Sequence, residues 1–219
     1  MRKLFSLLIL LALIMQITPV NAANKSVTFT AEVWADNWFA LYINGKLVGQ
    51  DSVPITTERS FNSERITFKA TYPLIIGLLG KDFKENDSGL EYIGSNRQQI
   101  GDGGVVLQIK ESTSGKIIAT TSKKWKVLAI QQAPLNSECV KSEDPLRDCK
   151  SSEKLIPSTW FKSSYSDSKW SYAREYSASE VGVKDGYLDI KWDQKAKLIW
   201  GEDLKVDNTL LFRYKVSGK

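Results

Sequence analysis

The residues with the most recognisable chemistry are the carboxylates of one polar stretch, residues 81–104. Asp82, Asp87, Glu91 and Asp102 lie there, and neighbouring asparagines add amide oxygens. Ca²⁺ prefers such hard oxygen ligands, so these four residues are candidate calcium ligands. Their spacing matches no EF-hand loop, and the plainer interpretation of the same residues is a solvated loop surface.

Aromatic side chains form the second group of candidates. The chain has 7 Trp, and a large rigid ring can either fill a core or stack against a sugar ring. Trp34 and Trp38, with Tyr42 nearby in the sequence, are the candidate ligand-binding residues. The plainer interpretation is that they cap the ends of a β-sandwich. We expect the remaining five tryptophans to lie nearer the core: Trp125, Trp160, Trp170, Trp192 and Trp200.

Catalysis is not predicted. The chain contains no histidine, which excludes a Ser/His/Asp triad, a Cys/His dyad and histidine-bound metals. A glycosidase could work with two carboxylates alone, but the Glu-x-Asp-x-Glu strand of jelly-roll glycanases is missing. The sequence also has no phosphate-binding glycine loop and no Gly-x-Ser-x-Gly motif. We therefore name no catalytic residues.

The first 22 residues have the features of a signal peptide. Arg2 and Lys3 precede an uncharged apolar run from Leu4 to Ile17, and Val20-Asn21-Ala22 offers small residues for cleavage after Ala22. The run is shorter than the roughly 20 residues that span a bilayer, although a retained membrane helix is the alternative. We expect an exported protein without an integral membrane span after cleavage.

Charge and cysteine content agree with export and argue against nucleic acid as a partner. Losing Arg2 and Lys3 lowers the net charge from +5 to +3, which is too small for a nucleic-acid-binding surface. Cys139 and Cys149 are the only cysteines, and an oxidising compartment would join them. A redox or metal-binding pair is less well supported, because the spacing is not Cys-x-x-Cys.

The pattern of the remaining chain is typical of short antiparallel strands. Val27, Phe29, Ala31 and Val33 alternate with polar residues, and Asn44-Gly45 predicts a two-residue hairpin turn. Only Ser177–Glu180 reads as a short capped helical turn, ended by Gly182. The other predicted strands cover residues 39–43, 46–48, 66–70, 74–79, 105–109, 117–121, 125–130, 187–192, 198–200 and 210–216.

These features predict an all-β protein, an antiparallel β-sandwich or jelly roll. We expect a single domain at residues 23–219. A long loop at residues 81–104 and a disulfide-linked excursion at residues 131–157 interrupt its strands.

Three segments carry a resemblance to a known family. Ala35-Asp36-Asn37-Trp38-Phe39-Ala40-Leu41-Tyr42-Ile43-Asn44-Gly45-Lys46-Leu47-Val48-Gly49, Ser122-Lys123-Lys124-Trp125-Lys126-Val127 and Tyr165-Ser166-Asp167-Ser168-Lys169-Trp170-Ser171-Tyr172-Ala173 resemble galactose-binding-domain-like β-sandwiches, and Trp200-Gly201 follows in the expected order. Ser166 departs from the acidic residue that is usual there. The resemblance implies a two-sheet jelly roll whose loops at one end can hold a sugar, sometimes with a structural calcium.

The polar residues Asp36, Asn37 and Asp167 lie within these segments, and we expect them to be structural hydrogen-bond acceptors near strand ends. The leading hypothesis is a secreted, non-catalytic module that binds a glycan or another cell-surface component. The competing hypothesis is an envelope or extracellular module that docks another protein and has no small ligand.

Overall fold

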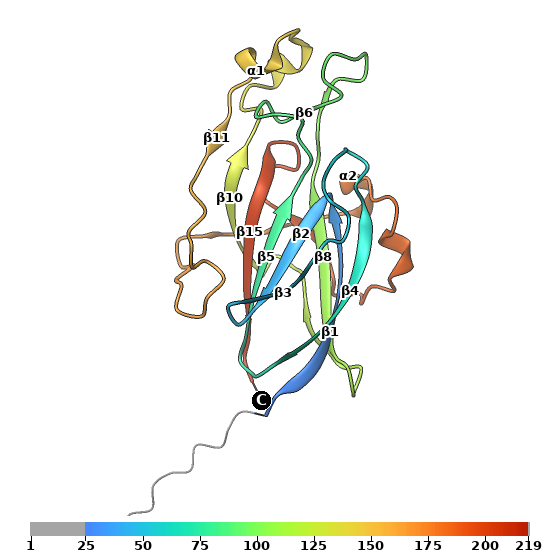
Figure 1. The fold of residues 1–219 in the computed structure, drawn as a ribbon, viewed down its shortest axis with the longest axis vertical. Coiled ribbons are helices and arrows are strands. Elements are labelled where there is room, and N and C mark those ends of the chain that lie inside the picture. Colours follow the sequence, from blue (N-terminus) through green and yellow to red (C-terminus); the bar gives the residue numbers. More distant parts are fainter. Residues whose placement is uncertain (1–24, 219) are drawn as a thin grey trace, which may run out of the picture.

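The computed structural model describes residues 25–218, and the predicted signal peptide at residues 1–22 lies outside them. The fold is all-β: two antiparallel sheets pack face to face as a sandwich (Figure 1), which confirms the predicted class. No helix within residues 25–218 is long and apolar enough to cross a membrane.

The first sheet has the strand order β13-β14-β8-β1-β4, and β9 pairs with β8. The two longest neighbours, β1 and β4, pair over nine residues, from Val27–Ala70 to Ala35–Asn62. The strands are β1 (Val27–Asp36), β4 (Asn62–Ala70), β8 (Gly104–Glu111), β9 (Ile117–Thr120), β13 (Arg174–Tyr176) and β14 (Leu198–Trp200).

The second sheet has the order β11-β10-β15-β5-β2-β3, and β12 pairs with β10. Its strands are β2 (Trp38–Ile43), β3 (Lys46–Gln50), β5 (Leu74–Lys81), β10 (Lys126–Gln132), β11 (Ser152–Glu153), β12 (Ser171–Tyr172) and β15 (Asp207–Val216). β2 and β3 form the predicted hairpin: Asn44 and Gly45 have φ of 51° and 83°, the positive values that a type I′ turn requires.

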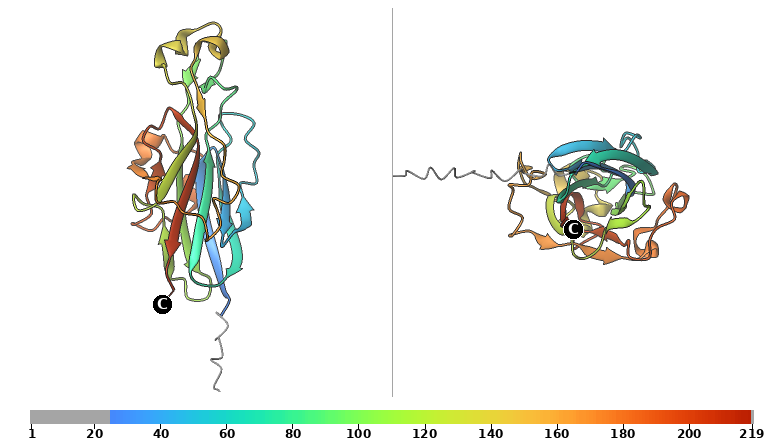
Figure 2. Two further views of the ribbon diagram at one scale, coloured as in Figure 1. Left: turned by 90° about the vertical axis from the view of Figure 1, so that its left-hand side faces the viewer. Right: turned by 90° about the horizontal axis from the view of Figure 1, so that it is seen from below.

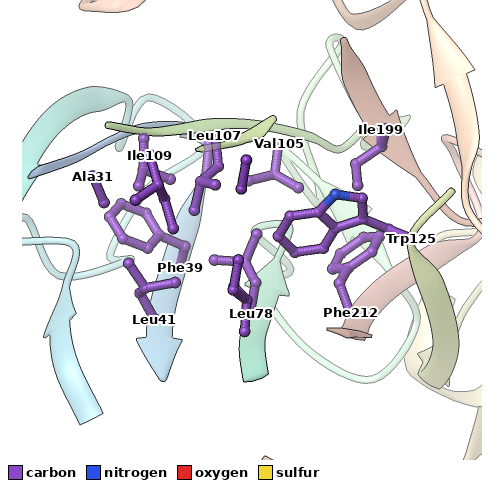
Figure 3. Close-up of a cluster of buried hydrophobic side chains, with 14 of the residues drawn as sticks. Ala31, Phe39, Leu41, Leu78, Val105, Leu107, Ile109, Trp125, Ile199 and Phe212 are labelled. Carbon is purple, nitrogen blue, oxygen red and sulfur yellow. The ribbon is translucent and has the colours of Figure 1, made fainter. Parts of the chain in front are cut away.

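The core lies between the two sheets. Phe29, Ala31, Val33 and Ala35 of β1 are fully buried on the inner face, as their alternation predicts. Figure 3 shows side chains from both sheets meeting there, including Leu107, Leu78 and Phe212. The large ring of Trp125 fills the same layer and stacks on Tyr214 at 5.3 Å.

Across residues 25–218, helical structure is limited to short turns. α2 (Ala178–Val181) begins at Ser177, whose side chain and that of Glu180 form a capping box, and it ends at Gly182 with φ 65°, as predicted from these three residues. The other turns are η1 (Ser137–Lys141), α1 (Pro145–Asp148) and η2 (Tyr187–Asp189).

The strand predicted at residues 187–192 is wrong. Tyr187–Asp189 is the 3₁₀ turn η2, which follows Gly186 in a left-handed conformation. Long-range contacts hold this segment across the outer face of the first sheet. Arg65 donates to the Asp189 carbonyl at 2.8 Å, and Gln108 donates to the Lys191 carbonyl at 3.1 Å. The alternation of Leu188 and Ile190 therefore reflects one exposed and one buried turn position.

The two long interruptions of the strand pattern pack against each other at one end of the sandwich. Residues 81–104 contain the small hairpin β6 (Leu90–Glu91) and β7 (Gln99–Ile100). The predicted disulfide is confirmed, with Cys139 and Cys149 at a Cα–Cα distance of 5.2 Å. Both cysteines pack on Leu90, so a minor core connects the excursion to the hairpin. The excursion projects beyond the sheets near α1 (Figure 2).

Candidate functional site

Strand register brings acidic residues from distant parts of the sequence to the end of the sandwich near β6. Asp36 ends β1 and faces Gly104, the first residue of β8, so Asp102 lies two residues away from that pairing. The backbone N–H of Asn37 donates to the Lys81 carbonyl at 2.8 Å. This bond places Asp82 next to the same strand end. Glu91 ends β6 in the intervening loop.

These carboxyl groups lie unusually deep for charged residues. Asp36 is 2%, Asp82 3% and Glu91 6% exposed, and Asp102 is half-buried. Oδ2 of Asp36 and both carboxyl oxygens of Asp82 are buried without a hydrogen-bond partner among residues 25–218. A buried acceptor that lacks a donor costs about 1 to 3 kcal/mol of stability. The cluster of these four carboxyl groups therefore has too few hydrogen-bond donors in the described part of the chain.

The pKa values of the cluster move in one direction. Burial raises the pKa of both Asp36 and Asp82 well above the usual range, and the neighbouring negative charges add to the effect. The pKa values of Glu91 and Asp102 are raised by burial as well. The cluster therefore holds protons more tightly than exposed carboxylates do.

Gly101 allows the loop to pass close over two of these groups. A Cβ atom at this position would lie 2.7 Å from Oδ2 of Asp82 and 3.2 Å from Oε1 of Glu91. Both distances are shorter than an ordinary van der Waals contact. Side chains larger than hydrogen at position 101 would displace the carboxyl groups.

The cluster opens into a cleft of about 310 Å³, which we call the acidic cleft. One wall is Tyr92, whose ring carries the Arg97 guanidinium 4.1 Å from its centroid. Lys184 also lines the cleft, with Nζ 4.8 Å from the centroid of the Phe61 ring. The lining residues are Asp36, Glu58, Arg59, Phe61, Glu91, Tyr92, Gln99, Asp102, Lys184 and Asp185.

The predicted calcium ligands are only partly brought together. Asp82, Glu91 and Asp102 lie in or directly behind the acidic cleft, but Asp87 is exposed and bonded to Lys84 at 2.6 Å. Within residues 25–218, no three acidic or cysteine side chains are arranged to hold a metal ion. The orphaned oxygens point to a missing partner, but the side-chain arrangement does not fit a calcium centre, and calcium binding stays a prediction.

The predicted stacking residues do not line the acidic cleft. Trp34 is fully buried on the outer face of β1, between Phe61 and Tyr187, and so it has no free face for a sugar. Tyr42 is covered by Trp160 and Phe161, the latter at 4.7 Å.

Trp38 is half-buried, with the Lys81 ammonium 5.3 Å from its ring centroid. It is more exposed than Trp34, but it lies outside the cleft.

The polar residues expected to be structural differ from one another. Asn37 bridges two loops, accepting from the Phe83 amide at 2.6 Å and donating to the Glu58 carbonyl at 3.1 Å. Asp167 accepts from the buried Arg213 guanidinium at 2.9 Å. Asp36 leaves one oxygen without a partner and lines the acidic cleft, which makes it a candidate site residue.

Larger clefts lie elsewhere, with volumes of about 420, 450, 500 and 570 Å³. Those of 450 and 570 Å³ share Ile117 and Ile118, and the former reaches the sandwich end formed by Val27 and Val216. The buried, partnerless polar atoms found within residues 25–218 belong to none of these four linings. The acidic cleft is therefore the better candidate for a ligand site, although it is smaller than these four.

Sequence reasoning missed Glu58, Tyr92 and Lys184 as lining residues of the cleft. They come from three loops separated by tens of residues, and no local spacing connects them. One feature of the sequence could have indicated the site: Asp36, Asp82 and Asp102 all flank the ends of strands. Comparisons with protein-family models, curated proteins and solved structures found no match for this chain.

Proposed function

We propose that this protein is an exported, non-catalytic module that binds a carbohydrate in the acidic cleft, in the manner of galactose-binding-domain-like jelly rolls. The observation that carries this proposal is the combination of a concave site with orphaned acceptors and an aromatic wall, all at one end of the sandwich. Ligand sites are typically concave and contain a few convergent polar groups.

The chemistry of the lining suits sugar hydroxyl groups. Glu91 and Asp102 supply acceptors, while Gln99 and Arg59 supply donors. Tyr92 adds an amphipathic ring, the kind of surface that packs against the apolar face of a sugar. A cleft of about 310 Å³ is at the lower end of the range for small-molecule sites, which favours one or two sugar units.

A glycan array followed by calorimetry tests the proposal. We expect binding of at least one carbohydrate, and we expect Tyr92→Ala to weaken it about tenfold, which corresponds to about 1.4 kcal/mol. The matched control is Tyr172→Ala, because Tyr172 is 64% exposed and lines a different cleft.

Each binding measurement is made with added Ca²⁺ and again with a chelator. A calcium requirement would support the predicted cofactor, whereas equal affinity would contradict it. If no array sugar binds at millimolar concentration, the carbohydrate proposal fails, and docking of another protein becomes the better hypothesis.

A further inference from the structure

The acidic cleft has more acidic than basic side chains, an excess that neutral sugars do not require. Its lining contains five acidic residues against two basic ones, Arg59 and Lys184. Asp82 adds a further carboxyl group directly behind the lining, close enough that the charges of Asp36, Glu91 and Asp102 act on it. A ligand with a positive charge would relieve this imbalance.

A second, independent observation points to a missing donor. Asp36 is only 2% exposed. It lines the cleft, and its Oδ2 has no hydrogen-bond partner in the part of the chain that the structure describes. Asp82, beneath it, has two such oxygens. Buried polar groups are nearly always paired in folded proteins, so these atoms mark the place where a donor belongs.

The partner of these acceptors need not be a metal ion. Residues 25–218 contain no three acidic side chains arranged around one ion. An amine carried on a sugar ring has several N–H and O–H donors at different positions, so each carboxyl group can contact a different atom.

Lys184 places an ammonium group among the lining residues of the cleft. Its charge acts on Asp36, Glu91 and Asp102, and its side chain is exposed and rests on the Phe61 ring. A flexible lysine on the surface can move aside at little cost when a ligand cation enters.

We propose that the carbohydrate bound in the acidic cleft carries a free, protonated amine, as a glucosamine unit without its acetyl group does. This inference rests on the proposed function and names its ligand class. Glu91 and Asp102 hold the ammonium at the cleft, with Asp36 beneath them, and acetylation of the amine removes both the charge and two of its donors.

The test compares two probes that differ only in that acetyl group: a glucosamine hexamer and an N-acetylglucosamine hexamer. Calorimetry at pH 6, where the amine is protonated, should show at least tenfold tighter binding of the glucosamine hexamer. Asp102→Asn should reduce this preference about tenfold, because the amide keeps the shape and removes the charge. The control variant Glu153→Gln removes an exposed charge on β11 and should leave the preference unchanged.

Each outcome is decisive for the amine inference. Equal affinity for the two hexamers, lost together in Asp102→Asn, would overturn it and leave the proposed carbohydrate function in place. Glucosamine binding that Asp102→Asn does not change would also overturn it, because the contact would lie outside the cleft. Binding of neither hexamer overturns it too, and the glycan array then decides independently whether the proposed function fails. Circular dichroism of each variant confirms that it is folded.

Discussion

Buried carboxyl groups in this protein differ in whether they have partners. Glu32 is buried on the first sheet and lies against Arg65 at 3.1 Å, Lys110 at 3.2 Å and Gln108 at 2.7 Å. Burial raises its pKa, but these partners outweigh burial, and the net shift is downward. Asp36 and Asp82 have orphaned oxygens instead, and their pKa values rise. The fold therefore neutralises Glu32 with cations and leaves the acidic cleft without enough of them.

Asp51 tests at a single residue how burial of a carboxyl group makes stability depend on pH. Its Oδ1 accepts from the Val53 amide at 2.9 Å, Oδ2 has no partner, and burial raises its pKa to about 7. An acid whose pKa is higher in the folded state stabilises the fold below its unfolded pKa of about 3.9 and loses that contribution as the pH rises through 7. Asp51→Asn should therefore increase the free energy of unfolding by about 2 to 4 kcal/mol at pH 8 and change it little at pH 4.

Urea denaturation of both proteins at pH 4, 6 and 8 measures this difference. The amide oxygen of asparagine can still accept from Val53, so the turn itself is preserved. A stability difference that does not vary with pH would show that Asp51 is ionised in the folded protein.

Asp167 makes a different contribution, because its partner is a buried cation. Arg213 is 4% exposed and also donates to the carbonyls of Trp160, Lys162 and Tyr165. Asp167→Ala leaves the guanidinium with these carbonyls but without a counter-charge. The free energy of unfolding should fall by about 1 to 3 kcal/mol, with the carbohydrate affinity of the folded fraction unchanged.

The matched control is Glu202→Ala, which breaks the exposed ion pair with Arg174 at 3.4 Å and should cost less than about 1 kcal/mol. If Asp167→Ala leaves the denaturation midpoint in place but abolishes binding, Asp167 belongs to the ligand site and its structural assignment is wrong.

At the scale of elements, the disulfide-linked excursion supports the hairpin that carries part of the cleft. Gln98 donates to the carbonyls of Val140 at 2.7 Å and Ser142 at 2.9 Å. Leu90 packs against both cysteines. Glu91 and Tyr92 follow Leu90 directly. We therefore expect the excursion to hold these two lining residues of the acidic cleft in place.

Removing the bridge should therefore affect stability and binding together. The double variant Cys139→Ser, Cys149→Ser should lower the free energy of unfolding by about 2 to 3 kcal/mol, because a loop of this length is no longer closed in the unfolded chain. Hydrogen exchange should accelerate at residues 85–100 and 135–150, while amides of β15 stay protected. Faster exchange confined to residues 135–150 would contradict the coupling to the hairpin.

At the scale of the whole molecule, the acidic groups with raised pKa values decide how stability depends on pH. Burial raises the pKa values of six acidic groups: Asp36, Asp51, Asp82, Glu91, Asp102 and Asp207. The folded state thus binds more protons than the unfolded chain above pH 4, and the free energy of unfolding must fall as the pH rises. The pKa values of Glu32, Asp87, Asp148 and Glu180 are lowered and have the opposite effect. Asp87, Asp148 and Glu180 are exposed, so we expect the six buried or half-buried groups to dominate.

Thermal and urea unfolding between pH 4 and pH 8 check this prediction. We expect the highest midpoint near pH 4 to 5 and a steady decrease towards pH 8. A midpoint that rises over this range would mean that the buried carboxyl groups acquire partners that the structure does not show. Asp36→Asn should flatten the dependence, since it removes one of the contributing protons.

The sequence by itself determined the features that depend on neighbouring residues. Alternating apolar side chains located the major strands, because successive residues of a strand face opposite sides. Asn44-Gly45 specified a turn through its positive φ values, and Ser177, Glu180 and Gly182 marked both ends of α2. The pairing of Cys139 with Cys149 could be predicted because the chain has only two cysteines. All these inferences rely on constraints that act within a few residues.

Only the tertiary structure decided what surrounds each residue. Trp34 occupies an outward position on β1, but Phe61 and Tyr187 cover it. Residues 187–192 alternate like a strand, yet Arg65 and Gln108 hold them as a turn. The acidic cleft needs the β1–β8 register to place Asp36 near Asp102. Such contacts join residues tens of positions apart, and their energies depend on packing and desolvation that no local pattern encodes.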